Sequence, residues 1–414
     1  MEQGSVKKNI TLLFSTVVVG SLVGLVAMAL SFFLDGVESF FLHFNESASQ
    51  PSPISSQPWL RLLSVFLGGI LVSIVWYLLR RYGRPIVGIK GAVKGQEMPL
   101  METLINVVTQ IFYVGTGGSV GRELAPRQAG AALAQWWERL LGKTKLGSLG
   151  SDDLQLLVTA AAGAGFAGVY IAPITGMLFS IEVLLKKVSI RTIAVSLGMS
   201  IIATLFGSLA KGFRPYYLVG DLHFSISILL VGCLLAPIAG VTGAFFRQAM
   251  AWAQTHQKAG TAILWQLPLV ALATGAIAYY YPNIFGNGRP IAQSAMNVSS
   301  LSFATTLLLL ALIKFGLTFS TLKAGGTGGT LTPAIASGAA LGAMLGSILT
   351  LFIPGISIPQ TTILMAAAFL AASQQAPLMA MFMIFEISHL DYSALLPLGG
   401  AVVIAVATTK LRWR

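Results

Sequence analysis

The feature that most restricts the fold of this 414-residue chain is an apolar run without charged residues, from Ile10 to Leu34. A helix needs about 20 apolar residues to cross the core of a bilayer, so this run is long enough to span one. It is longer than the apolar region of a cleaved signal peptide, and many further apolar segments follow it. Charged residues make up only 10% of the chain, against about 25% in soluble domains. The sequence therefore predicts an all-α polytopic membrane protein.

The net charge of +12 is arranged as a topology signal rather than as a binding patch for nucleic acid. Lys7 and Lys8 precede the first apolar run, and the segment from Asp35 to Pro58 contains no Lys or Arg. Five basic residues follow the second run: Arg80, Arg81, Arg84, Lys90 and Lys94. This pattern predicts a multi-pass protein of the cell inner or plasma membrane with its N-terminus in the cytoplasm. We expect membrane lipid, and no nucleic acid, as its surroundings.

Cysteine and histidine give no sign of a disulfide framework or a metal site. Cys233 is the single cysteine, and the four histidines lack metal-ligand spacing. We expect neither a metal nor an organic cofactor.

A polar, basic break from Lys211 to Asp221 interrupts the apolar segments. We expect residues 1–210 to form the first membrane half with the N-terminal helix, residues 211–221 to link the halves, and residues 222–414 to form the second half. No soluble regulatory domain is expected. Several segments are short or are cut by Gly and Pro, a pattern that marks the binding site of many transporters when it occurs in both halves.

The first pair of similar segments consists of Gly117–Leu133 (GGSVGRELAPRQAGAAL) and Gly325–Leu341 (GGTGGTLTPAIASGAAL). Their glycines match at a constant offset, but Pro126 and Pro333 are one position out of step. A second pair consists of Ala167–Leu184 and Ala371–Ser388. In each member of this pair a proline precedes a glutamate by nine residues. The two pairs occur in the same order and predict an internal repeat.

Glu123 is the candidate with the clearest chemistry. It lies where a Gly-rich turn leads into a helix, and the unpaired N–H groups and positive dipole of a helix start bind anions. An ionisable group at membrane depth costs about 2.5–3.5 kcal/mol on insertion scales, which makes it a functional candidate. The alternative is a capping carboxylate that pairs with Arg122. Glu182 and Glu386 also lie in apolar stretches, but near expected helix ends, where capping or pairing is the simpler reading.

These motifs resemble those of the CLC chloride channels and transporters. GGSVGRELAP resembles the family's GREGP signature, and GGTLTP at Gly328–Pro333 resembles its GxFxP signature. The APITGMLFSIEVL segment, the GNG at Gly286–Gly288 and the EISHLDYSALLP at Glu386–Pro397 also match. The resemblance extends from about Leu60 to the end of the chain and is nearest to the bacterial ClcB-like branch.

The resemblance implies a CLC-type fold of two inverted repeats with broken and tilted helices, one anion pore per subunit and a homodimer. Glu123 would be the gating carboxylate, which competes with chloride when ionised and swings away when protonated. The implied anion-binding positions are Gly121, Arg122, Glu123, Thr330, Leu331 and Tyr392. The phenol of Tyr392 would act as an O–H donor and the others through backbone amides, which hold an anion weakly enough to release it. Tyr392 has an alternative reading as an interfacial aromatic residue.

Three departures from the family pattern bear on selectivity and coupling. GRPIV at Gly83–Val87 takes the place of the GSGIP signature, so Arg84 or Pro85 replaces the anion-binding serine and the inner anion contact stays open. Leu124 stands where a glycine is usual. The proton-transfer glutamate of the exchangers aligns with Val183, which cannot carry a proton.

We therefore expect transport of chloride, by a channel or an H⁺/Cl⁻ exchanger, with fluoride or another anion as the alternative. The sequence does not distinguish these mechanisms, the direction of flux, or gating by voltage or pH. An integral membrane enzyme is disfavoured because the chain has no HExxH, GxSxG or acidic metal motif. A cation carrier is disfavoured because Gly-rich helix starts present N–H groups, which have the wrong polarity for a cation.

Overall fold

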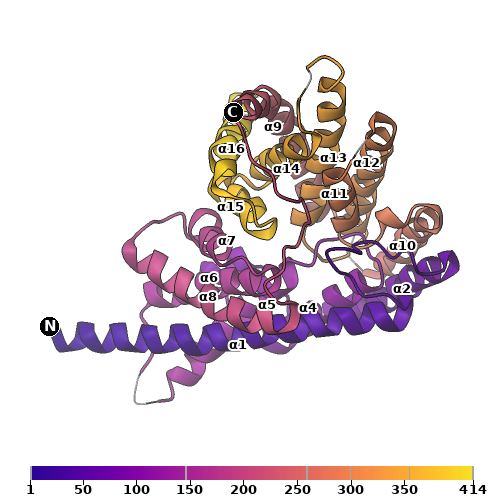
Figure 1. Ribbon diagram of the computed structural model, residues 1–414. Coiled ribbons are helices and arrows are strands. Elements are labelled where there is room, and N and C mark those ends of the chain that lie inside the picture. Colours follow the sequence, from indigo (N-terminus) through magenta and orange to yellow (C-terminus); the bar gives the residue numbers. More distant parts are fainter. Residues whose placement is uncertain (1, 145–146, 258–259, 299, 354, 413–414) are drawn as a thin grey trace. The chain divides into compact units, whose positions relative to one another are not determined.

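The computed structural model describes residues 2–144, 147–257, 260–298, 300–353 and 355–412 (Figure 1). The α-helices of the first part are α1 (Glu2–Leu42), α2 (Pro58–Tyr82), α3 (Ile89–Val93), α4 (Leu100–Gly115), α5 (Leu124–Leu141), α6 (Ser151–Tyr170), α7 (Pro173–Leu178) and α8 (Ile190–Lys211). Those of the second part are α9 (Ile226–Thr255), α10 (Ile263–Tyr280), α11 (Arg289–Met296), α12 (Leu301–Lys323), α13 (Leu331–Leu349), α14 (Ile358–Gln374), α15 (Pro377–Ile387) and α16 (Leu395–Arg412). A π-helix, η1 (Phe179–Leu185), follows α7, and the 3₁₀ turns are η2 (Gly260–Ala262), η3 (Pro282–Ile284) and η4 (Tyr392–Ala394).

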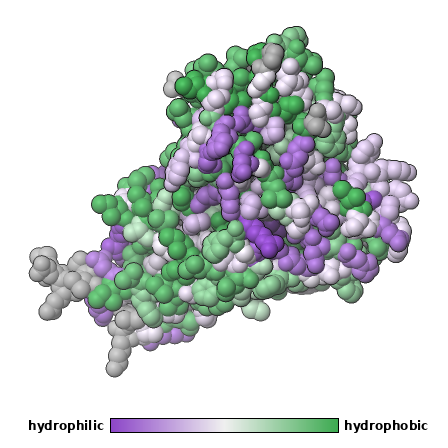
Figure 2. Space-filling view, viewed as in Figure 1, coloured by the Kyte–Doolittle hydropathy of each residue, from purple (hydrophilic) through white to green (hydrophobic). Residues whose placement is uncertain are grey.

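The predicted all-α polytopic membrane fold is confirmed. In the part of the chain that the structure describes, eight helices are long and apolar enough to cross a bilayer, and no strand is present. Large apolar side chains such as Leu13, Phe40 and Leu234 are exposed, and Figure 2 shows hydrophobic residues spread over much of the visible face. A surface of this kind is suited to lipid. The first helix is longer than the predicted apolar run, because the helix continues past Asp35 to Leu42.

The chain forms two compact units. Unit 1 contains residues 1–33, 79–109 and 123–214, and unit 2 contains residues 34–78, 110–122 and 215–414. These units are defined by packing, whereas the predicted halves, 1–210 and 222–414, are defined by the polar break between them in the sequence. The halves and their linker therefore remain a prediction.

One fully packed helix of small residues forms the centre of each unit. In unit 1, α6 packs against α5, α7 and α8, and in unit 2, α14 packs against α9, α13 and α16 (Figure 1). Glycine permits the closest approaches: a Cβ on Gly130 of α5 would lie 2.2 Å from the carbonyl oxygen of Ala161 on α6. A Cβ on Gly338 of α13 would similarly lie 2.6 Å from the Cβ of Phe369 on α14. Close packing of backbones through small residues is how helices associate in a membrane.

The second repeated segment has the same local backbone in both units. Ile171 caps the C-terminus of α6 and Gln375 that of α14, and both residues adopt the left-handed conformation, with φ of 55° and 56°. In each case an alanine follows, and then a proline, Pro173 or Pro377, opens the next helix. Proline suits this position because the first N–H of a helix has no partner within the helix. The two copies then differ, because α7 continues into the π-helix η1 whereas α15 remains α-helical.

Candidate anion site

The two Gly-rich turns of the first repeat pair with each other inside unit 2. The Gly121 N–H donates to the Gly329 carbonyl at 2.7 Å, and the Gly329 N–H donates to the Gly121 carbonyl at 2.8 Å. Glycine is required nearby, because a Cβ on Gly328 would lie 2.5 Å from the Cβ of Val120. The paired bonds fix the backbone of both turns. They also occupy the Gly121 amide, which the sequence predicts as the first of the anion-binding amides.

The helices that follow these turns start in the same way but after different numbers of residues. Pro126 is the third residue of α5, and Pro333 is the third residue of α13. Thr330 alone separates Gly329 from α13, whereas Arg122 and Glu123 both lie between Gly121 and α5. The first copy thus has one extra residue. This explains why the prolines are out of step in the sequence comparison.

Glu123 occupies the N-cap position of α5 with helical backbone angles, and its side chain makes no capping hydrogen bond. The residue is completely buried, with 0% of its surface exposed. Its ion-pair partner within unit 1 is Arg127, whose Nη2 lies 3.9 Å from Oε1 of Glu123. The Arg127 Nε also donates a hydrogen bond to the Glu123 carbonyl at 2.7 Å. No motif marks Arg127, although its four-residue spacing from Glu123 on a helix is a usable signal in the sequence.

Arg122 belongs to a second buried ion cluster, formed by residues of unit 2. Its Nη1 lies 3.1 Å from Oε2 of Glu46, whereas Nη1 of Arg289 lies 3.0 Å from Oε1 of the same carboxylate. All three side chains are less than a tenth exposed. Arg122 thus forms an ion pair with a residue of the first loop, Glu46. The alternative in which it also pairs with Glu123 stays open.

Tyr216 holds the two arginines from the connection between α8 and α9. Its carbonyl accepts hydrogen bonds from Nε and Nη2 of Arg289, at 3.1 and 2.5 Å. Its ring lies 3.8 Å from the Arg289 guanidinium and 5.2 Å from that of Arg122, within range of cation–π attraction. Asn287 Nδ2 donates to the phenol oxygen at 3.1 Å. Burial raises the pKa of Tyr216 to about 12, so the phenol stays neutral.

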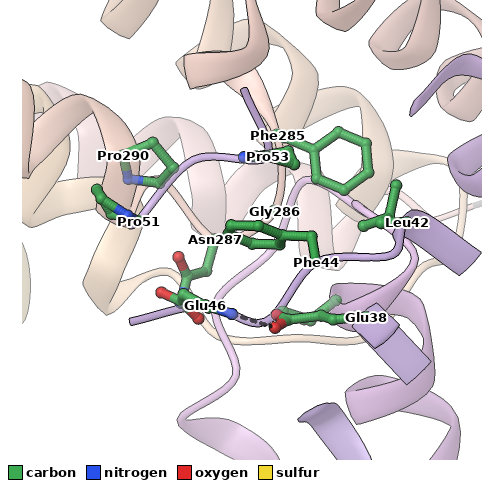
Figure 3. Close-up of a pocket in the computed structure, with 12 residues that line it drawn as sticks. Glu38, Leu42, Phe44, Glu46, Pro51, Pro53, Phe285, Gly286, Asn287 and Pro290 are labelled. Carbon is green, nitrogen blue, oxygen red and sulfur yellow. Dashed lines mark hydrogen bonds between the residues drawn. The ribbon is translucent and has the colours of Figure 1, made fainter. Parts of the chain in front are cut away.

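A small cavity of unit 2 adjoins this cluster (Figure 3). The carboxylates of Glu38 and Glu46 both line it, and Glu38 accepts a hydrogen bond from the Glu46 N–H at 2.8 Å. The remaining lining residues are Leu42, Phe44, Pro51, Pro53, Val114, Gly115, Phe285, Gly286, Asn287 and Pro290. No sequence motif marked Glu38, Glu46 or Arg289, because they come from distant segments that only the fold brings together.

The predicted anion contacts of unit 2 lie at the starts of helices. Thr330 is the N-cap of α13, and Leu331, its first residue, is 1% exposed. Tyr392 opens η4, is 84% exposed and has its ring centroid 6.1 Å from that of Phe385. Asp391 caps this turn, and hydrogen bonds from Ser393 lower the pKa of the Asp391 carboxyl. The anion-binding roles of Thr330, Leu331 and Tyr392 remain predictions.

The predicted inner contact and the proton-transfer position both lie in unit 1. Arg84 and Pro85 are exposed, and Nε of Arg84 lies 3.0 Å from Oε1 of Glu102. This hydrogen bond raises the pKa of Arg84. Val183 lies half-buried within the π-helix η1, directly after Glu182. π-Helical turns are rare and frequently occur at functional sites.

Comparisons with known proteins agree on one family. Residues 68–410 match the model of the voltage gated chloride channel family. A ClcB-like chloride channel protein of Ralstonia nicotianae is 28% identical over 367 residues, which are 84% of this chain and 82% of the relative. A slow cyanobacterial Cl⁻/H⁺ antiporter has a similar structure, with a TM-score of 0.80 at 20% identity over 97% of this chain and 94% of the other. A CLC-type fluoride/proton antiporter gives a TM-score of 0.67 at 20% identity over 96% of both chains. The predicted CLC-type fold and ClcB-like resemblance are confirmed.

Proposed function

Because the chain belongs to the voltage-gated chloride channel family, we propose that it carries chloride across the membrane and that the Glu123 carboxylate is its gate. The observation that carries this proposal is the placement of Glu123. A completely buried carboxylate stands at the start of α5, directly after a turn whose backbone is fixed by glycine pairing. An ionisable group in such a place is costly, which makes it a functional candidate.

The gate works by competition between a tethered anion and a free one. Ionised Glu123 is attracted to the positive end of α5 and excludes chloride from it. A proton removes this attraction, so the side chain leaves and an external anion takes its place. The amides of Arg122 and Glu123 before α5, those of Thr330 and Leu331 at the start of α13, and the Tyr392 phenol provide donors without a full charge. Such donors allow the anion to leave again.

The same proposal favours movement of chloride without coupled protons. Val183 has no ionisable group, so the route that a glutamate would offer at this position is missing. A second solute, fluoride, remains as the alternative anion, because Arg84 and Pro85 stand where the family has an anion-binding serine. We further propose that the protein is a homodimer with its N-terminus in the cytoplasm, in agreement with the positions of Lys7 and Lys8.

The test is efflux of chloride from proteoliposomes, with the pH recorded in the same sample. We expect the wild type to release chloride at a rate that rises as the pH falls, and Glu123→Gln to release it at a rate independent of pH. Glu97→Gln is the matched control, because Glu97 is an exposed acid of unit 1. It should retain the pH dependence of the wild type.

Two results would contradict parts of this proposal. Intact pH dependence in Glu123→Gln would remove Glu123 from the gate. Uphill movement of protons driven by chloride would show coupled exchange and refute the uncoupled mechanism. Repeating the assay with fluoride and with a large cation identifies the solute.

A further inference from the structure

Arg127 has more hydrogen-bonding capacity than its surroundings use. The residue is 8% exposed, and its Nε donates to the Glu123 carbonyl at 2.7 Å. Its Nη2 is 3.9 Å from the nearer oxygen of Glu123, which is an ion-pair distance but too long for a hydrogen bond. Within the described residues, neither Nη1 nor Nη2 has a hydrogen-bond partner. Neither nitrogen is completely enclosed, so these N–H groups remain open to an anion that approaches the guanidinium.

Two aromatic rings fix the plane of this guanidinium. Its central carbon lies 4.9 Å from the ring centroid of Phe179 and 5.7 Å from that of Phe166. Phe166 belongs to the buried part of α6, and Phe179 is the first residue of the π-helix η1. Aromatic faces attract the cation but accept no strong hydrogen bond. A polar ligand must therefore approach the Nη1 and Nη2 groups along the edge of the guanidinium.

We propose that Arg127 is a specificity-determining ligand for the transported anion and favours planar oxyanions over spherical halides. This inference rests on the proposed function of Glu123. While Glu123 is ionised, its charge balances that of Arg127. When Glu123 takes up a proton, the cation is left without its counter-charge, and an incoming anion restores the balance.

The class of anion follows from the geometry of the guanidinium. Its planar fork presents two parallel N–H groups, which match two oxygens of a planar oxyanion such as nitrate. A halide is a single sphere, so both N–H groups must converge on one atom, which their parallel directions fit less well than two oxygens. Arg127 also carries a full charge, whereas backbone amides carry only partial charges. An anion that contacts Arg127 should therefore bind more tightly and leave more slowly than one held by amides alone.

The experiment measures binding of nitrate and of chloride to purified protein by titration calorimetry. Glu123→Gln serves as the reference, because it removes the competing carboxylate. In the double variant Glu123→Gln/Arg127→Gln both charges are removed together, so no buried charge is left unbalanced. We expect the double variant to lose roughly tenfold in affinity for nitrate, as expected for hydrogen bonds to a charged group, and less in affinity for chloride. Arg139→Gln in the Glu123→Gln background is the matched control, because it removes an exposed arginine of the same helix.

A lysine variant separates charge from geometry. Glu123→Gln/Arg127→Lys keeps the positive charge but lacks the planar fork, so it should bind chloride as the reference does and lose the preference for nitrate. If glutamine at position 127 impairs folding, this lysine variant still allows the ratio of nitrate to chloride affinity to be compared with that of Glu123→Gln. An unchanged ratio of nitrate to chloride affinity in either double variant would overturn the role of Arg127.

Flux measurements distinguish this failure from failure of the proposed function. Absence of anion flux in both the wild type and Glu123→Gln would refute the proposed function itself. Intact flux with an unchanged nitrate-to-chloride ratio in the double variants would refute only the role of Arg127.

Discussion

Arg122 and Glu123 are neighbours in the chain, yet they belong to two buried ion clusters of different construction. Glu123 faces Arg127, four residues along the same helix, at 3.9 Å. Arg122 reaches Glu46, 76 residues earlier in the chain, at 3.1 Å, and shares it with Arg289. The Glu123–Arg127 pair thus joins residues that are close in sequence at a long ion-pair distance. The Arg122–Glu46 pair joins residues that are far apart in sequence at a short distance.

The difference suggests that the Glu123–Arg127 pair can open, whereas the cluster of Arg122, Glu46 and Arg289 stabilises the fold. A local pair can form with its helix and can open without moving any other element, which suits a side chain that changes partner. The distant cluster exists only when the first loop, the turn before α5 and the start of α11 are all in place. Its carboxylate is shared by two arginines, so it stabilises the packing of unit 2. The predictions below test this distinction.

The largest expected effect comes from Glu46→Gln. This change leaves Arg122 and Arg289 without the carboxylate that both contact, and breaking a buried ion pair in this way costs about 3–5 kcal/mol. We expect a clear fall in the thermal unfolding temperature of the purified protein in detergent. A variant that unfolds at the same temperature as the wild type would show that the cluster does not stabilise unit 2.

A smaller effect is expected for Tyr216→Phe. The phenylalanine keeps the ring beside Arg289 and the backbone carbonyl that accepts its hydrogen bonds. It removes only the phenol oxygen that accepts from Asn287 Nδ2 at 3.1 Å. Loss of one such hydrogen bond costs about 1 kcal/mol. We expect a fall in unfolding temperature of matching size in the same thermal assay. A loss as large as that of Glu46→Gln would mean that the phenol, rather than the carboxylate, organises the cluster.

The smallest effect is expected for Glu97→Gln, which breaks a solvent-exposed ion pair. Glu97 pairs with Arg139, and their side chains are 66% and 43% exposed. Exposed pairs contribute less than about 1 kcal/mol and weaken further in salt. The unfolding temperature should stay close to that of the wild type. A fall in unfolding temperature as large as that of Glu46→Gln would show that the buried ion pairs stabilise the protein no more than this exposed pair does.

The sequence was sufficient to predict the class of fold and to select Glu123 as the candidate gate. Apolar run length and charge placement indicated a polytopic protein, and the Gly-rich turn before Glu123 indicated an anion site. Apolar run length and a Gly-rich turn are local properties of the chain, so a sequence shows them directly. The assignment of an anion site is further supported by several family motifs that occur in a fixed order. The structure and the comparisons confirm the fold, while the roles of the site residues remain for experiment.

The partners of the charged residues could not be predicted in the same way. Glu46 lies in a polar loop without a motif, and only folding brings it to Arg122 and Arg289. Arg127 was within reach of a helical spacing argument, but its aromatic neighbours come from α6 and η1. Long-range contacts of this kind depend on how helices pack, which a single sequence does not specify.

The extra residue of the first repeat has a wider consequence. The glycine pairing before it and the proline after it match the second repeat, so the insertion is absorbed within one short link, between Gly121 and Leu124. A duplicated scaffold of this kind can acquire an ionisable group in one copy while its frame stays unaltered. By the same reasoning, lengthening the link at Thr330 by one acidic residue would be the most economical way to place a second carboxylate before a helix start.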